Sequence, residues 1–147
     1  MRNKIHRAKK VLLFSHQTSI NDMIENLGVL KLSDCPYWYS MSDIIFMPSL
    51  LETFSSTYPE AMVMGKPIVT TDLDFAHEIC RDAAAYYDPL SFQSAAEVIQ
   101  AVAHDKMLCK TLINNGYKRL KQFPNLDEKY LLIMDWITYV SKIKSDK

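Results

Sequence analysis

Two short apolar runs with a helical pattern between them constrain the fold of this chain more than any other feature. Residues 43–47, DIIFM, predict a buried strand that Pro48 ends, and residues 67–71, PIVTT, predict a second strand. Between them, Pro59 suits the first turn of a helix, where its missing N–H is not needed, and Gly65 suits the helix exit. This order forms a βαβ unit, which predicts a parallel sheet with a right-handed crossover.

The pattern adds apolar runs before this unit and helices after it. Residues 11–14, VLLF, fit a strand or a piece of helix, and residues 23–27 fit a strand that ends at Gly28. In the second half, Ser91 and Asp105 are suited to begin two helices. The apolar face predicted for the first of these helices holds Phe92, Ala95, Ala96, Ile99 and Ala103.

The C-terminal segment predicts one more helix. Phe123 and Pro124 end the preceding helix, and Asn125 followed by Glu128 resembles a capping box that opens a helix to about residue 143. We therefore expect an α/β fold, a Rossmann-like parallel sheet with flanking helices and a helical C-terminal tail.

Composition excludes several classes of protein. The 17 basic and 17 acidic residues balance, so the charge does not indicate a nucleic-acid partner. A basic run at residues 2–10 predicts a solvated chain end or a membrane-surface patch. The three cysteines form no C-x-x-C pair, which favours free, mostly buried thiols over disulfides or zinc. No apolar stretch is long enough for a membrane span or a signal peptide, so we expect a soluble cytoplasmic protein, with peripheral contact at the inner membrane face left open by the basic run.

Two acidic residues flank the turn between the predicted strand and helix. Glu52 follows the strand end, and Glu60 lies in the first turn of the helix. Ligands of open α/β sheets bind beyond the carboxyl ends of the strands, and the N–H groups of a helix N-terminus favour phosphate. Carboxylates accept hydrogen bonds from the hydroxyls of a sugar and a ribose. A phosphate site between two such acids indicates a sugar nucleotide.

The same segment carries a family resemblance. Residues 48–69, PSLLETFSSTYPEAMVMGKPIV, resemble the E-x7-E signature of retaining GT-B glycosyltransferases of family 4, the glycosyl transferases group 1, in their C-terminal donor-binding domain. Upstream, Gly28, Val29, Leu30, Tyr39, Ser42 and Asp43 match the family's approach to this motif. Downstream, residues 72–89 are similar to the branch that builds bacterial surface polysaccharides such as O-antigen. The resemblance covers residues 23–123.

The resemblance implies a role for each site residue. Glu60 holds the ribose hydroxyls, and Glu52 faces the donor sugar as the catalytic residue. The remaining donor contacts come from backbone groups, with the amides of Phe54, Ser55 and Ser56 at the sugar, that of Thr57 at the diphosphate, and Val29 and Leu30 at the base. The implied donor is a UDP- or GDP-sugar, the acceptor is a glycan or lipid-linked glycan, and no metal is required. Many relatives have glycine where this chain has Ser55, so the backbone approach to the sugar differs here.

The resemblance also implies that residues 1–147 form a single partial domain, the donor-binding half of a GT-B enzyme, without the N-terminal acceptor domain. The Arg/Lys pair that stabilises the leaving diphosphate in relatives is not recognisable. We therefore expect this chain to bind nucleotide weakly and not to turn over by itself. In relatives the last helix crosses to the other domain, so Tyr130, Trp136 and Tyr139 predict an exposed apolar face that promotes self-association.

Other interpretations stay open beside this one. A non-catalytic nucleotide-binding or interaction module keeps the same acids, whereas a GT-B sugar-nucleotide epimerase fits less well because the E-x7-E turn is typical of transferases. Asp72, Asp74 and His77 form either a turn before a helix or a metal cluster, and the turn is favoured. The aromatic run at residues 37–39 packs in a helical core or stacks on a base, with core packing favoured. His16 beside Ser15 and Ser19 lacks the G-x-S-x-G elbow of a hydrolase.

Overall fold

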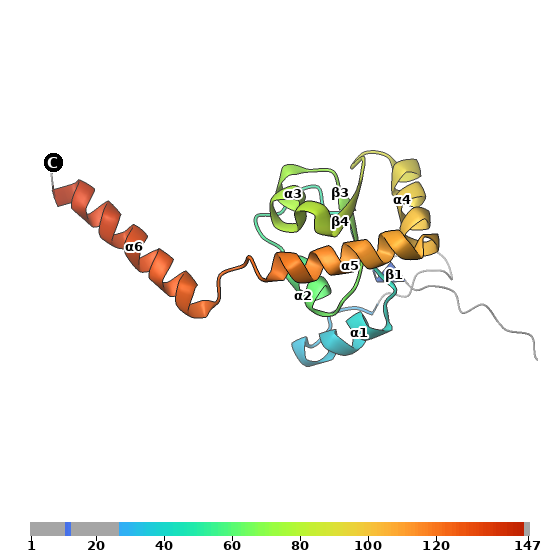
Figure 1. Ribbon diagram of the computed structural model, residues 1–147, viewed down its shortest axis with the longest axis horizontal. Coiled ribbons are helices and arrows are strands. Elements are labelled where there is room, and N and C mark those ends of the chain that lie inside the picture. Colours follow the sequence, from blue (N-terminus) through green and yellow to red (C-terminus); the bar gives the residue numbers. More distant parts are fainter. Residues whose placement is uncertain (1–10, 13–26, 146–147) are drawn as a thin grey trace, which may run out of the picture.

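A parallel sheet with helices on both faces forms the body of the molecule (Figure 1). The structure is a computed structural model and describes residues 11–12 and 27–145. Four strands lie side by side in chain order, all parallel: β1 (Val11–Leu12), β2 (Ile44–Met47), β3 (Ile68–Thr71) and β4 (Ala84–Tyr87). The helices are η1 (Leu32–Asp34), α1 (Cys35–Met41), α2 (Thr57–Val63), α3 (Asp74–Cys80), η2 (Arg81–Ala83), α4 (Phe92–His104), α5 (Lys106–Leu120) and α6 (Leu126–Ser145). The predicted α/β fold and the βαβ unit β2–α2–β3 are confirmed.

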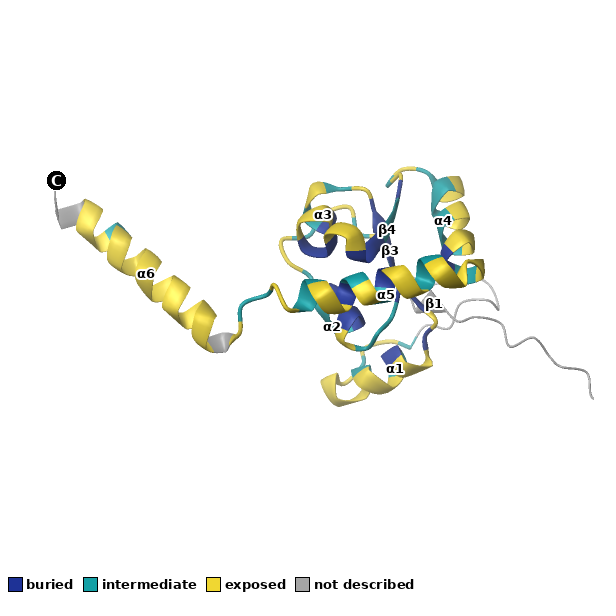
Figure 2. Cartoon of the chain, viewed as in Figure 1, coloured by how far each residue is buried: buried dark blue, intermediate teal, exposed yellow. Residues whose placement is uncertain are grey.

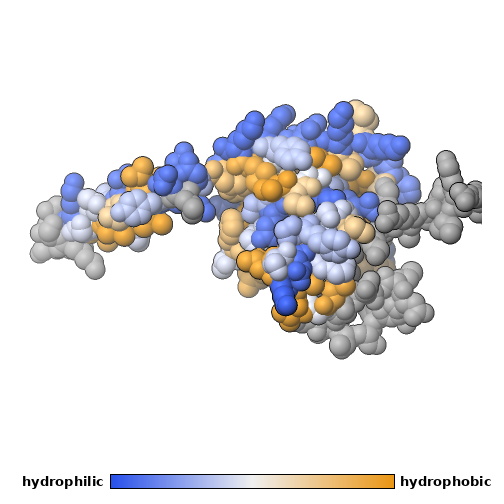
Figure 3. Space-filling view, turned by 90° about the horizontal axis from the view of Figure 1, so that it is seen from below, coloured by the Kyte–Doolittle hydropathy of each residue, from blue (hydrophilic) through white to orange (hydrophobic). Residues whose placement is uncertain are grey.

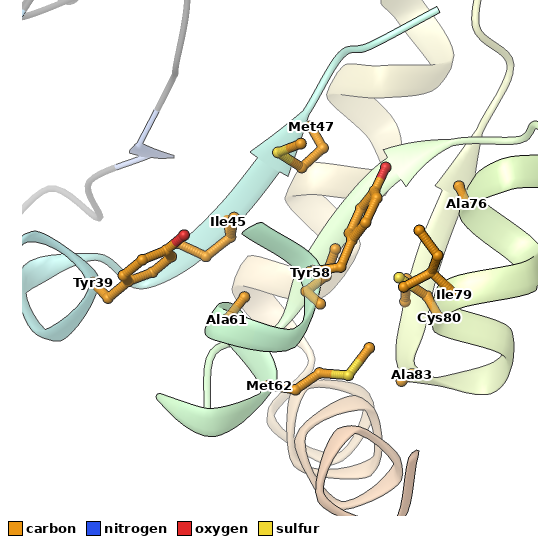
Figure 4. Close-up of a cluster of buried hydrophobic side chains, with 12 residues drawn as sticks. Tyr39, Ile45, Met47, Tyr58, Ala61, Met62, Ala76, Ile79, Cys80 and Ala83 are labelled. Carbon is orange, nitrogen blue, oxygen red and sulfur yellow. The ribbon is translucent and has the colours of Figure 1, made fainter. Parts of the chain in front are cut away.

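Alternate side chains of β2, β3 and β4 enter two separate apolar layers, as the two-residue period of a strand requires. One layer joins Ile45, Met47 and Ile68 to α1, α2 and α3 (Figure 4). The other joins Ile44 and Val69 to α4 and the first half of α5. Both faces of the sheet are therefore covered, and the strands consist of almost uninterrupted apolar residues, as in parallel sheets generally.

The turn out of α2 requires glycine. Gly65 has φ of 60°, a left-handed conformation that favours glycine, and its N–H donates to the Met62 carbonyl at 3.1 Å. A Cβ atom at this position would lie 2.3 Å from the Tyr117 hydroxyl oxygen. Pro59 occupies the third position of α2, within its first turn, as the sequence predicts.

The caps of α4 and α5 are confirmed, but the predicted apolar face of α4 is partly wrong. Ser91 accepts a hydrogen bond from the Ser94 amide, and Asp105 accepts from the Met107 and Leu108 amides. Phe92 is 78% exposed and Ala96 is also exposed. Phe92 is the first residue of α4 and lies ahead of the turns that pack on the sheet. The residues that do pack there are Ala95, Val98, Ile99, Val102 and Ala103.

Arg119 of α5 closes the C-terminal end of α3. Its Nε donates to the Ile79 carbonyl at 2.8 Å, and one terminal nitrogen donates to the Glu78 carbonyl at 2.9 Å. The other terminal nitrogen donates to Gln122, and the guanidinium carbon lies 4.6 Å from the centre of the Phe123 ring. Carbonyl groups at a helix end have no partner within the helix, so Arg119 stabilises the turn that leads from α3 to β4.

Helix α6 extends away from the body, and most of its side chains are exposed (Figures 1 and 2). The predicted capping box opens it, because the Asn125 amide donates to Glu128 Oε2 and the Glu128 amide donates to Asn125 Oδ1, each at 2.9 Å. Tyr130, Trp136 and Tyr139 are between 62% and 66% exposed. Apolar side chains lie at the surface of this helix among charged ones (Figure 3). Within the described residues, no helix is both long and apolar enough to span a bilayer.

Several predicted features lie outside the described residues, namely the basic run at 2–10, residues 13–14, the motif around His16, and most of the strand at 23–27. Residues 11–12 form a strand, so of the two alternatives for 11–14 the strand is the one observed there. The sequence interpretation did not predict β4.

Candidate functional site

Two buried threonines at the end of β3 fix the chain as it leaves β2. Thr70 Oγ1 donates to the Met47 carbonyl at 3.3 Å, and Thr71 Oγ1 donates to the Ser49 carbonyl at 2.8 Å. Both threonine side chains are fully buried. The start of the loop between β2 and α2 is therefore held against the carboxyl end of the neighbouring strand, which is where ligands of this fold class bind.

Tyr58 of α2 is anchored to the same edge of the sheet. Its hydroxyl lies 2.8 Å from Thr70 Oγ1, beside the ends of β2 and β3 (Figure 4). Since the single Thr70 proton points to the Met47 carbonyl, Tyr58 is the donor in this pair. Burial raises the pKa of Tyr58 to about 12, and the charge of Glu52 contributes to the increase. The Tyr58 hydroxyl therefore stays protonated and keeps its hydrogen bond to Thr70.

Glu52 is half-buried and held at one oxygen. The Ser49 hydroxyl donates to Glu52 Oε1 at 3.1 Å. Together with the bond from Thr71 to the Ser49 carbonyl, this contact links the carboxylate to the end of β3. Of the described residues, none donates a hydrogen bond to Glu52 Oε2, which leaves this oxygen able to accept a hydrogen bond from a ligand hydroxyl.

Glu60 is held in the same manner by a residue of α1. The Tyr39 hydroxyl donates to Glu60 Oε2 at 2.8 Å, and Tyr39 is only 3% exposed. Burial raises the pKa of Tyr39 above its usual range, with further contributions from the hydrogen bond and the charge of Glu60. The hydroxyl therefore stays protonated and remains a donor. The sequence interpretation assigned Tyr39 to the family pattern and to core packing but did not pair it with Glu60.

The segment between the two acids enters α2 without a side-chain cap. The first helical hydrogen bond runs from the Glu60 amide to the Ser56 carbonyl at 3.0 Å. The amides of Thr57 and Tyr58 precede this bond, and Pro59 has no N–H. Ser56, which directly precedes the helix, makes no side-chain capping bond. Phe54 is 55% exposed, while Ser55 and Thr57 are half-buried. Backbone donors at this end of α2 are thus available to an anionic or hydroxylated ligand.

Comparison with known proteins identifies the family. The family model described as glycosyl transferases group 1 matches residues 5–119. The chain belongs to this family. It is 29% identical over 101 residues to the O-antigen chain mannosyltransferase B of Escherichia coli, an alignment that covers 68% of this chain and 26% of that protein. The chain thus spans about a quarter of the length of this relative.

Solved structures agree on the fold of this glycosyltransferase domain. Sucrose-phosphate synthase from Thermosynechococcus elongatus superposes with a TM-score of 0.62 at 21% identity, over 72% of this chain and 27% of the synthase. The C-terminal domain of a glycosyl transferase group 1 family protein from Francisella tularensis superposes with a TM-score of 0.56 at 25% identity, over 64% of this chain and 49% of that domain.

Two predicted donor contacts of the glycosyltransferase domain come from outside the loop between the two acids. Val29 and Leu30 follow Gly28 and precede η1, and Val29 is 91% exposed. Their contact with the base stays a prediction. A groove of about 600 Å³ lies elsewhere, between residues 121–124 and the first turns of α6. The predicted site residues do not line this groove.

Asp72, in the turn before α3, and His77 of α3 form a side-chain pair. His77 Nε2 contacts Asp72 Oδ1, and the imidazole stacks on Tyr86 with ring centres 3.9 Å apart. Asp74 is the first residue of α3, so the segment is a turn into a helix, as predicted. Within residues 11–12 and 27–145, His, Cys, Asp and Glu side chains form no group of three that could hold a metal ion.

The aromatic run and the cysteines follow the favoured interpretation only in part. Tyr39 is in the core, but Tyr37 is 59% exposed and packs edge-on against the half-buried Trp38. Among the residues of α1, Tyr39 is the one that is buried in the core. The three cysteines are free; Cys80 is buried, while Cys35 and Cys109 are partly exposed.

Proposed function

We propose that this chain is the donor-binding domain of a retaining glycosyltransferase that uses a UDP- or GDP-sugar. The observation that carries the proposal is the pair Glu52 and Glu60. Each carboxylate is held at one oxygen by a hydroxyl, and the uncapped start of α2 lies between them in the chain. In this assignment Glu60 binds the ribose hydroxyls and Glu52 faces the hydroxyls of the transferred sugar.

The chemistry follows from the polarity of these groups. As the bond from sugar to diphosphate breaks, negative charge grows on the leaving phosphate. The amides of Phe54, Ser55, Ser56 and Thr57 donate to the sugar and the diphosphate, and the positive end of α2 adds to their effect. Donors fixed before the reaction do not have to reorganise as charge develops, so this stabilisation requires no metal ion.

The acceptor side of the reaction is assigned to a second domain. We propose that an acceptor-binding domain presents a glycan or lipid-linked glycan to the donor held here, in a pathway of the surface-polysaccharide type. The similarity to an O-antigen chain mannosyltransferase supports this class of acceptor.

Binding of nucleotide tests the proposal directly. UDP, GDP and their sugar conjugates are titrated against the chain by ligand-observed NMR, with Glu60→Ala as the test variant and Glu97→Ala, an exposed acid of α4, as the matched control. We expect one nucleotide family to bind and Glu60→Ala to weaken it about tenfold, the effect of removing a charged hydrogen-bond acceptor. Absence of binding, or equal effects of the two substitutions, contradicts the proposal.

A second experiment separates the role of Glu52 from donor affinity. In a protein that carries this domain together with an acceptor-binding domain, Glu52→Gln keeps an oxygen for Ser49 but removes the charge. We expect kcat to fall about a hundredfold while nucleotide affinity changes by less than about twofold, because the charge acts on the transition state. Equal losses in both quantities would show that Glu52 only anchors the donor.

A further inference from the structure

We infer that Tyr39 is a positioning residue that sets the preference of this domain for a ribonucleotide. Since Glu60 is a ribose ligand only under the proposed function, this role of Tyr39 depends on that function. The relationship that carries the inference is the hydrogen bond of 2.8 Å from the Tyr39 hydroxyl to Glu60 Oε2.

The tyrosine itself is immobilised by its surroundings. Tyr39 is 3% exposed and belongs to the apolar layer that contains Ile45 and Ala61 (Figure 4). Helix α1 is tied to the far end of α2 as well, because Lys66 Nζ donates to the Ser40 carbonyl at 3.0 Å. Contacts at both ends of α2 therefore keep the Tyr39 hydroxyl at one place relative to Glu60.

The bond engages one carboxylate oxygen and leaves the other for the ligand. Among the described residues, no donor reaches Glu60 Oε1, and the side chain is only half-buried. A free glutamate on a helix surface samples several rotamers, whereas this one is oriented before the ligand arrives. Orientation before binding reduces the entropy that a ligand must offset, so it raises the affinity for a group that Glu60 contacts.

Only a ligand with the hydroxyl that Glu60 recognises benefits from this orientation. A nucleotide without the 2′-hydroxyl loses one donor to the carboxylate and gains less from a fixed Glu60. The expected signature of Tyr39 is therefore a difference between ribonucleotide and deoxyribonucleotide affinity, whereas general damage to the fold would weaken both alike.

The experiment measures the affinities of UDP, GDP, 2′-deoxy-UDP and 2′-deoxy-GDP by isothermal titration calorimetry. The proteins are the unchanged chain, Tyr39→Phe, Glu60→Ala and the control Tyr86→Phe. Tyr86 is a half-buried tyrosine, and its hydroxyl donates to the Arg81 carbonyl rather than to Glu60. Tyr39→Phe keeps the ring and removes only the hydroxyl. A partly unfolded fraction would reduce both affinities equally and would leave their ratio unchanged.

We expect the unchanged chain to prefer the ribonucleotide about tenfold and Tyr39→Phe to lose most of that preference, chiefly through weaker ribonucleotide binding. Tyr86→Phe keeps the preference, and Glu60→Ala abolishes it. If Tyr39→Phe keeps the full ratio of ribonucleotide to deoxyribonucleotide affinity, or if it lowers both affinities by the same factor, the role of Tyr39 is overturned while the proposed function stands. Failure of the unchanged chain to bind any of the four overturns both.

Discussion

The side chain of Thr71 at the end of β3 donates a hydrogen bond of 2.8 Å to the carbonyl of Ser49, just beyond the end of β2. This bond joins two neighbouring strands where the loop that carries Glu52 begins. We expect Thr71→Val, which keeps the shape but removes the donor, to lower the unfolding free energy by about 1–3 kcal/mol, because a carbonyl at this edge loses its partner.

Urea denaturation measures this effect, and Thr111→Val provides the matched control. Thr111 Oγ1 donates to the Met107 carbonyl on the exposed side of α5, where water replaces the lost donor. We expect the control to change the unfolding free energy by less than about 0.5 kcal/mol. Equal effects of the two substitutions would show that the Thr71 bond contributes nothing particular to the sheet edge.

The turn after α2 predicts a second stability effect. Gly65→Ala places a methyl group at φ of 60° and against the Tyr117 hydroxyl, 2.3 Å from its oxygen. We expect the unfolding free energy to fall by about 2 kcal/mol or more. About 1 kcal/mol of this is the cost of the left-handed backbone conformation for a residue that has a Cβ atom. Measuring Gly65→Ala in a Tyr117→Phe background removes the hydroxyl but leaves the ring carbon 3.3 Å from the new methyl group, so the difference between the backgrounds measures the clash with the hydroxyl. If the loss is the same in both backgrounds, the clash with the Tyr117 hydroxyl is not its cause.

Alkaline pH acts on the buried thiol of Cys80. Burial raises the pKa of Cys80 from 9.0 to about 12, and the charge of Arg119 opposes this increase only in part. The unfolded thiol ionises first as the pH rises, so the contribution of Cys80 to stability is fully present below pH 9.0 and is lost progressively toward pH 12. Urea unfolding at a series of pH values measures how steeply the unfolding free energy falls as the pH rises. We expect Cys80→Ala to reduce this slope and Cys109→Ala to leave it unchanged; the opposite order would contradict the assignment.

The apolar surface of α6 predicts association of the chain with itself. Trp136 and Tyr139 are 66% and 63% exposed, and water contact with such side chains is unfavourable. We expect the weight-average mass from analytical ultracentrifugation to rise with concentration. The double substitution of Trp136 and Tyr139 by lysine lowers this rise, whereas Phe92→Lys, at an exposed apolar position of α4, does not. A constant monomer mass would refute the prediction.

Local signals were sufficient for the parts of the fold that the sequence predicts correctly. The strands β2 and β3 are continuous apolar runs, and proline and glycine mark the limits of α2 between them. The caps at Ser91, Asp105 and Asn125 depend on residues only two or three positions away, so their spacing can be read directly. Strand β4 was harder to predict, because it has only four residues, AAYY, and follows directly on another alanine, Ala83.

Contacts between distant residues could not be read from the sequence. The pair Tyr39 and Glu60 is separated by 21 positions and exists only because α1 packs against α2. Similarly, Phe92 fits the helical period of α4, but the period alone does not show that the sheet covers only the later turns. For the site, the sequence indicates both acids and the loop between them. The hydroxyls of Ser49 and Tyr39 that donate to these acids can be identified only in the folded structure.

The contacts of Arg119 require a guanidinium group, which lysine cannot supply. Its planar group reaches the carbonyls of Glu78 and Ile79, the Gln122 amide and the face of Phe123 at the same time. A lysine carries the same charge on a single nitrogen and has no flat surface to lie on an aromatic ring. Geometry, more than charge, therefore sets which side chain can close the end of α3 at residue 119.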